Sequence, residues 1–190
     1  MGLTQPIRDP AQVRAFVKYY IDNGQYRNYV LVNIAIYTAL RIGDILNLRC
    51  RDVFDFENHC AHDTVTIIEQ KTGKHKTIAL HQNIKEALGL YFRSSAPGPY
   101  TPLILNKNTG ASISRIQANR IFHESACAVG IPHKVTCHSL RKTFGFHSWQ
   151  NGVSPVLLME IFNHSSYSIT RRYLGVTQDD KNAVYRNLII

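Results

Sequence analysis

The chain has few cysteines and no long apolar run. Its 190 residues include four cysteines, Cys50, Cys60, Cys127 and Cys137, and no two of them form a CxxC pair. The first 30 residues are amphipathic and charged, unlike a signal peptide, so we expect reduced thiols and no disulfide framework. No segment approaches the roughly 20 apolar residues that span a bilayer. We therefore expect a soluble, cytoplasmic protein.

Acidic residues are also scarce, and they are scattered. The chain has 13 Asp and Glu against 22 Lys and Arg, which gives a net charge of +9. A metal-dependent nuclease needs a cluster of carboxylates, and the pattern offers none, so no metal and no other cofactor is expected. His59, Cys60 and His62 lie close together, but no second ligand pair at a zinc-like spacing accompanies them. The positive charge favours nucleic acid as a partner, although an ordinary basic protein can have the same balance.

The apolar residues that are present fit one domain over residues 1–190, with a core large enough to be stable without disulfides or metal ions. Helical spacing follows Asp9 and Pro10 up to Gly24, and further helices are expected over residues 29–40, 45–48, 84–92 and 114–129. From His138 onward the pattern predicts short helices, broken at residues 151–152 and near 163–164. Residues 64–68 and 77–80 are rich in β-branched side chains and flank a turn at 71–74. The sequence therefore predicts an α+β fold, mainly α, with one small antiparallel sheet.

One pair of residues offers chemistry to a shared substrate group. His138 and Arg141 are three residues apart on an expected helix, so both side chains can project from the same face. Alone this is a weak signal, because such pairs are common on surfaces. Three further features stand around it: Arg41 follows an apolar helix, Lys71 lies in the expected turn, and Tyr173 comes nine residues after His164.

The segments 38–48, 138–144 and 163–173 resemble the conserved boxes of the tyrosine recombinases of the phage integrase type. The likeness covers nearly the whole chain as a catalytic domain. It implies the fold of the DNA breaking-rejoining enzymes and assigns the family's Arg-Lys-His-Arg-His-Tyr set, in order, to Arg41, Lys71, His138, Arg141, His164 and Tyr173. It also implies a site-specific recombinase or integrase that joins DNA strands through a 3′-phosphotyrosyl intermediate, for integration or excision of a mobile element.

The chemistry of these side chains agrees with such roles. Two guanidiniums offer permanent charge and forked donors to phosphate oxygens. A phenol with a pKa of about 10 needs a partner that takes its proton, and His138 is the expected acid/base. Lys71 would protonate the departing 5′-oxygen, and His164 would hydrogen-bond the phosphate. Asp44 is expected to be a structural partner of the active-site arginine. Three further lysines are candidate contacts to the DNA backbone: Lys74, Lys76 and Lys142.

Some alternatives and departures remain at this stage. Tyr167 and Tyr185 compete with Tyr173 as nucleophile, although their spacing from His164 fits the family less well. Lys74 and Lys76 compete with Lys71. Asn163 stands where most members of the family have Gly, and Asn can adopt the left-handed conformation that Gly would supply at a helix end. Lys142 stands where His is common.

The resemblance further implies a double-stranded DNA attachment site and a homo-tetramer on DNA. In that assembly the C-terminal segment, residues 179–190, would dock on a neighbouring protomer, with Val184 and Leu188 offering a small apolar face. Core-binding and arm-binding domains are expected to be absent from this chain. The alternatives are a type IB topoisomerase-like or telomere-resolving enzyme, and a non-catalytic DNA-binding module with the same fold.

Overall fold

A computed structural model of the chain describes residues 4–175, 182, 185 and 186. The first helix, α1 (Pro10–Asp22), begins as the sequence predicts. Asp9 caps it, because its Oδ1 accepts a hydrogen bond from the backbone N–H of Ala11 at 2.8 Å, and Pro10 occupies the first helical position.

The second helix, α2 (Tyr26–Tyr37), begins and ends three residues earlier than expected. Two features stop it before Arg41. The hydroxyl of Thr38 donates to the carbonyl of Ile34 at 2.7 Å, and Ala39 takes a left-handed φ of 56°. Most of α2 is buried on every side, which is the property of a central core helix. The short helix α3 (Ile42–Asn47) then follows directly, so Arg41 lies at the junction of the two helices.

The strands form two separate antiparallel pairs where one sheet was expected. After a 3-10 turn, η1 (Cys50–Asp52), β1 (Phe54–Asp55) pairs with β2 (Cys60–Ala61). The longer pair joins β3 (Thr64–Ile68) to β4 (His75–Ala79), and β4 begins two residues before its predicted start. The pairing continues to Glu69, whose N–H donates to the carbonyl of Lys74 at 3.0 Å. Lys71 therefore lies in a tight turn at the tip of this hairpin.

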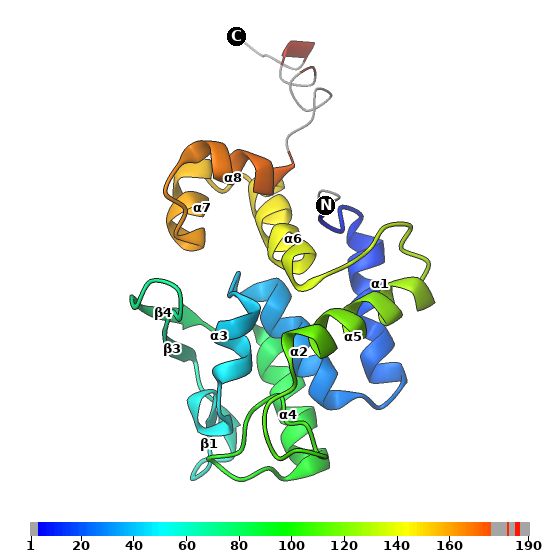
Figure 1. Cartoon of the computed structure of the whole chain (residues 1–190), viewed down its shortest axis with the longest axis vertical. Helices are drawn as coiled ribbons and strands as arrows, with labels where there is room; N and C mark the ends of the chain where they lie inside the picture. Colours follow the sequence, from blue (N-terminus) through cyan, green and yellow to red (C-terminus); the bar gives the residue numbers. More distant parts are fainter. Residues whose placement is uncertain (1–3, 176–181, 183–184, 187–190) are drawn as a thin grey trace.

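The remaining helices are α4 (Gln82–Ser95), α5 (Arg115–Ala128), α6 (Cys137–Gln150), α7 (Pro155–Phe162) and α8 (Tyr167–Leu174). The main core surrounds α2, which contacts α1, α4 and α6. A second, smaller core lies beneath α7 and α8 and contains Ala39, Leu158, Phe162 and Leu174. Figure 1 shows α7 and α8 at one end of the molecule, above the β3–β4 hairpin and α3. This mainly helical architecture confirms the predicted α+β fold class.

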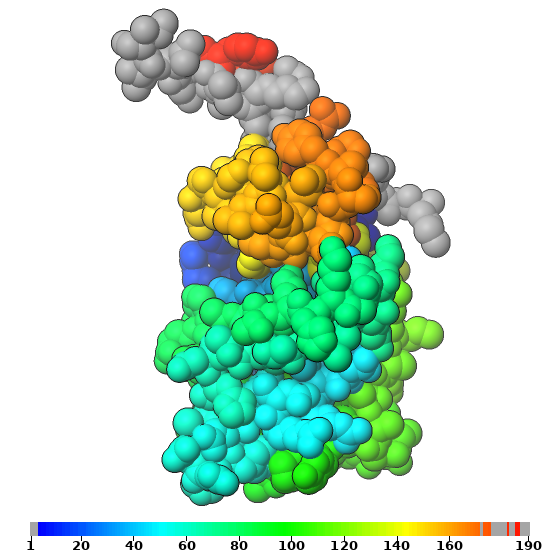
Figure 2. Space-filling model, turned by 90° about the vertical axis from the view of Figure 1, so that its left-hand side faces the viewer, coloured from blue at the N-terminus to red at the C-terminus, as the bar shows by residue number. Residues whose placement is uncertain are grey.

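The two cores meet along one face of the molecule. In Figure 2 the α7–α8 end lies over the β3–β4 hairpin, and a seam runs between them.

Within the described part of the chain, no helix is long and apolar enough to cross a membrane.

Candidate active site

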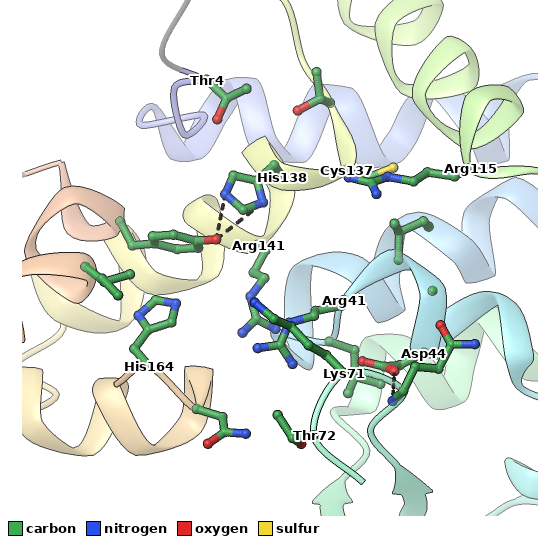
Figure 3. A pocket seen from close by; sticks show the side chains of 18 of the residues that line it. Thr4, Arg41, Asp44, Lys71, Thr72, Arg115, Cys137, His138, Arg141 and His164 are labelled. Atoms are coloured by element: carbon green, nitrogen blue, oxygen red, sulfur yellow. Dashed lines mark hydrogen bonds between the residues drawn. The ribbon is translucent and has the colours of Figure 1, made fainter. Parts of the chain in front are cut away.

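A pocket of about 1370 Å³ lies at the junction of the two cores. Its walls come from the α2–α3 junction, the tip of the β3–β4 hairpin, the start of α5, the first turns of α6 and the α7–α8 segment. Figure 3 shows His138 and Arg141 from α6 facing Arg41 and Lys71 from the first half of the chain. All six residues that the sequence singled out line this pocket: Arg41, Lys71, His138, Arg141, His164 and Tyr173.

The two arginines are held side by side by the end of α7. Arg141 is buried and donates hydrogen bonds to the carbonyls of Ala39 and, at 2.7 Å, Phe162. Nη2 of Arg41 also reaches the Phe162 carbonyl, at 3.4 Å. That carbonyl is at the C-terminus of a helix, where partial negative charge gathers and attracts cations. Burial, with the neighbouring Arg41 charge, lowers the pKa of Arg141 to about 10, so the guanidinium remains charged at neutral pH.

Tyr173 and His138 are in direct contact. The phenol oxygen lies 2.6 Å from Nε2 of His138, and the two rings meet edge to face with their centres 4.8 Å apart. Burial lowers the pKa of His138 to about 4, and the charges of Lys142, Arg141 and Arg115 act in the same direction. Burial also raises the pKa of Tyr173, although Arg141 and Arg41 oppose it. At neutral pH the phenol therefore keeps its proton and touches a neutral imidazole that can accept it.

His164 follows the turn that the sequence predicted. Asn163 takes the left-handed conformation, with a φ of 51°, and ends α7 as a Gly would. Nδ1 of His164 lies 3.0 Å from the hydroxyl of Thr170, and its ring stacks on Phe162. Burial and the charges of Arg141 and Arg41 lower the pKa of His164 to about 4. With Nδ1 engaged, Nε2 is the ring nitrogen that can serve a group bound in the pocket.

The four lysines lie in different surroundings. The side chain of Lys71 makes no hydrogen bond or ion pair with any described residue and lines the pocket. Nζ of Lys74 is 3.5 Å from the side-chain oxygen of Asn163, at the surface. Lys76 is half-buried and donates to the carbonyl of Ile161 at 2.6 Å, and burial lowers its pKa.

Lys142 does not lie on the surface, as a contact to the DNA backbone would require. It is only 6% exposed, donates to the carbonyl of Thr4 at 2.7 Å, and its Nζ lies 5.6 Å from the centre of the Tyr173 ring. The physical reason is its place on α6, because the fourth residue after His138 projects from the same helical face. The burial of Lys142 does not favour a contact to the DNA backbone, and that contact stays a prediction.

The carboxylate that pairs with Arg41 is Glu69. The charge of Asp44 raises the pKa of Arg141, and the structural role expected for Asp44 stays a prediction. Nη1 of Arg41 lies 3.2 Å from Oε2 of the buried Glu69. Asp44 is also buried, but its Oδ1 accepts from the backbone N–H of Gln70 at 2.9 Å, so it fastens α3 to the base of the hairpin. A sequence signal for Glu69 does exist. Burial alternates along β3, and the same alternation places Glu69 on the buried side with Val65 and Ile67.

The other tyrosine candidates do not reach the pocket. Tyr167, at the start of α8, is 52% exposed, and Tyr185 is 80% exposed. The four cysteines are free thiols, and the described residues contain no group of three or more His, Cys, Asp or Glu side chains that could hold a metal ion. Val184 and Leu188, and most of the segment 179–190 to which they belong, lie outside the described residues.

The fold is that of the tyrosine recombinases. The crystal structure of XerA recombinase superimposes with a TM-score of 0.77 at 21% sequence identity, covering 98% of this chain and 65% of that one. The post-cleavage complex of XerH site-specific recombinase with difH superimposes with a TM-score of 0.75 at 19% identity, covering 98% of this chain and 54% of that one.

Sequence comparison defines the family. The model of the phage integrase family matches residues 8–179, so the chain belongs to that family. A "Probable integrase/recombinase YoeC" of Bacillus subtilis is 38% identical, and the match covers 98% of this chain and 97% of the relative. "Tyrosine recombinase XerA" of Pyrococcus furiosus is 29% identical, over 87% of this chain and 56% of the relative. The chain thus spans nearly all of the first relative and about half the length of the second.

Proposed function

We propose that this protein is a tyrosine-type site-specific DNA recombinase, which breaks and rejoins strands through a covalent phosphotyrosyl link. The observation that carries the proposal is the contact of 2.6 Å between the phenol of Tyr173 and the neutral imidazole of His138. This pair lies in a pocket that also contains the guanidiniums of Arg41 and Arg141. Nucleophile, proton acceptor and phosphate-binding cations are thus available in one place.

In the cleavage step, Tyr173 Oη forms a bond to the phosphorus of a DNA phosphodiester while the bond to the 5′-oxygen breaks. His138 Nε2 accepts the phenol proton, and the 5′-oxygen takes a proton from Lys71. Negative charge that develops on the non-bridging oxygens is stabilised by the two arginines. For His164 we propose that Thr170 donates to Nδ1, which leaves the ring proton on Nε2 to hydrogen-bond the same phosphate.

The products are a 3′-phosphotyrosyl link and a free 5′-hydroxyl. The link keeps the energy of the phosphodiester, so a 5′-hydroxyl from another strand can attack the phosphorus and release Tyr173. In this reverse step His138 returns the proton to the phenol, and Lys71 accepts the proton of the attacking hydroxyl. Strand exchange therefore needs no ATP.

The proposal extends to the substrate and the assembly. The net charge of +9 supports double-stranded DNA as the partner. We expect this DNA to contain an attachment site, at which the protein would integrate or excise a mobile element. We expect residues 1–190 to act as one catalytic unit in the cytoplasm. Four copies would assemble on paired sites, with the segment 179–190 of each copy docked on the next.

The test is capture of the covalent intermediate. The protein is incubated with sheared genomic DNA of its source organism and denatured, and DNA that stays bound to protein is recovered and sequenced. A nicked suicide duplex built on the recovered site then measures the rate of adduct formation. The protein should form the adduct, Tyr173→Phe should abolish it, and the exposed Tyr167→Phe should form it normally. A chelator should leave the yield unchanged.

Three results would contradict the proposal. An adduct that persists in Tyr173→Phe would mean that another residue is the nucleophile. DNA binding without any adduct would identify a non-catalytic DNA-binding module. Relaxation of a supercoiled plasmid without joining of two sites would instead identify a topoisomerase-like enzyme.

A further inference from the structure

We infer that Glu69 is a positioning residue for this reaction, because it fixes the hairpin tip that carries Lys71 against Arg41 and the α7–α8 turn. The inference rests on the proposed function and concerns the same pocket. Glu69 does not line the pocket itself; it lies behind Lys71, at the base of the turn.

The carboxylate of Glu69 joins three segments of the chain. Its residue is only 2% exposed, and Oε2 accepts a hydrogen bond from the hydroxyl of Thr72 at 2.7 Å and another from the side-chain amide of Asn163 at 2.9 Å. The same oxygen lies 3.2 Å from Nη1 of Arg41. Burial alone would raise the pKa of Glu69, but the contacts with Thr72, Asn163 and Arg41 lower it below its ordinary value. The group is therefore ionised, and its Oε2 contacts all three segments.

The backbone of Glu69 also shapes the turn. Its carbonyl accepts from the N–H groups of Thr72, at 3.3 Å, and Gly73, at 2.8 Å, and its own N–H closes the hairpin to Lys74. Lys71 lies inside this loop of hydrogen bonds. Because the Lys71 side chain has no hydrogen bond or ion pair with a described residue, its location depends on the turn that Glu69 holds. Figure 3 shows Lys71 and Thr72 at the pocket edge, on the side of Arg41.

The opposite side of the pocket meets the hairpin through polar contacts. Asn163 receives Lys74 on its amide oxygen at 3.5 Å while its amide nitrogen donates to Glu69, and Lys76 donates to the carbonyl of Ile161 at 2.6 Å. A glycine at position 163 would supply the left-handed backbone and neither side-chain contact. The Asn that departs from the family pattern thus connects the turn before His164 to the hairpin that carries Lys71.

Loss of the Glu69 contacts should therefore misplace Lys71, the proposed general acid. A misplacement of about 1 Å in a reacting group can cost on the order of 100-fold in rate. The defect should appear in protonation of the leaving 5′-oxygen. A leaving group that needs no proton should remove it, because a thiolate is far less basic than an alkoxide.

The experiment uses two suicide duplexes on the recovered site, one normal and one with sulfur in place of the bridging 5′-oxygen. Glu69→Ala and the isosteric Glu69→Gln should form the adduct at least about 10-fold more slowly than the unchanged protein on the oxygen duplex. On the sulfur duplex most of this deficit should disappear, as it should for Lys71→Ala. Asn163→Gly should show the same pattern, less strongly. Glu57→Gln, an exposed carboxylate in the β1–β2 loop, is the control and should behave like the unchanged protein.

Each outcome decides the inference. Normal rates for Glu69→Gln on the oxygen duplex would overturn it, and so would an equal deficit on both duplexes, which would show that Glu69 acts on the fold or on Arg41 alone. Because Gln keeps the size of the side chain, Glu69→Gln decides the matter if Glu69→Ala fails to fold. A lack of adduct from the unchanged protein on both duplexes would overturn the proposed function itself, which is a different result from a deficit confined to the variants.

Discussion

Arg8 donates a hydrogen bond from Nη2 to the carbonyl of Gly175 at 3.1 Å, and thereby ties the N-terminal segment to the end of the helix that carries Tyr173. The segment is fixed to α6 at its other contacts. The N–H of Ile7 donates to the hydroxyl of Thr143 at 2.9 Å, and the carbonyl of Ile7 lies 3.0 Å from Nε2 of His147. Residues that precede the first helix thus connect α6, with its His138, to α8, with its nucleophile.

Arg8→Ala should slow adduct formation while leaving stability almost unchanged. Arg8 is exposed, so the lost hydrogen bond should cost no more than about 1 kcal/mol of unfolding free energy. The rate of adduct formation depends on geometry more steeply than the free energy of unfolding does. We therefore expect the rate to fall by roughly 3- to 10-fold. Single-turnover adduct formation and Tm, measured on the same sample, separate the two effects.

The matched control is Arg14→Ala, which removes an exposed arginine from α1. It should match the unchanged protein in both rate and Tm. If Arg8→Ala and Arg14→Ala gave equal rates, the N-terminal segment would have no part in placing Tyr173.

The pocket residues could be predicted because the resemblance to the tyrosine recombinases assigned them by position. Three segments carried five of these side chains in a fixed order, and Lys71 lay in the predicted turn; the structure brings all six side chains to one pocket. The conformation of Asn163 was also predictable, because the helix end before His164 requires a residue that tolerates the left-handed region.

The partners of those residues were harder to predict because they come from tertiary contacts. Asp44, three residues after Arg41, was the nearest carboxylate in sequence. Yet Glu69, which directly follows β3 and is 28 residues from Arg41, makes the ion pair. Its place on the buried side of β3 was the available signal, since a buried carboxylate requires a partner. The burial of Lys142 likewise follows from its helical spacing from His138, which its charge alone does not reveal.

Adduct formation should be nearly independent of pH between 7.5 and 5.5. Burial, with Lys142, Arg141 and Arg115 nearby, lowers the pKa of His138 to about 4, so the neutral form that accepts the Tyr173 proton persists down to that pH. The rate should fall only as the pH approaches 4 and His138 becomes protonated. A histidine with the ordinary pKa of about 6.5 would lose roughly tenfold over the same range. Single-turnover rates on the suicide duplex distinguish these cases, and a tenfold fall by pH 5.5 would contradict the assignment.

Lys142→Met should raise the pKa of His138. Lys142 is the largest cause of the lowered pKa after burial, and Met keeps much of the side-chain volume without the charge. The rise should be partial, because burial and the charges of Arg141 and Arg115 remain. NMR titration of the His138 ring measures the pKa, and the rate at pH 5.5 relative to pH 7.5 should fall in the variant.

Lys18→Met provides the comparison for this change. Lys18 is exposed on α1, where it pairs with Asp22, and its removal should leave the pKa of His138 where it was. An unchanged titration in Lys142→Met would show that its ammonium does not influence the imidazole.

Gly145→Ala should destabilise the protein, although Ala favours helices. Gly145 lies in α6, and a Cβ there would be 2.8 Å from Cζ and 3.0 Å from Cε2 of Phe162, whose ring is fully buried. Overpacking costs about 1–3 kcal/mol, against a helix-propensity gain of about 1 kcal/mol. We expect Tm to fall by a few degrees. The adduct should also form more slowly, because the Phe162 carbonyl holds both Arg41 and Arg141.

Gly89→Ala in α4 is the matched control: its Cβ would meet only the tip of Arg93, at 3.4 Å, and Tm should stay level or rise. A Tm for Gly145→Ala equal to that of Gly89→Ala would show that Phe162 can shift freely to make room for the methyl group. The close packing at Gly145 would then not position the Phe162 carbonyl that holds the two arginines.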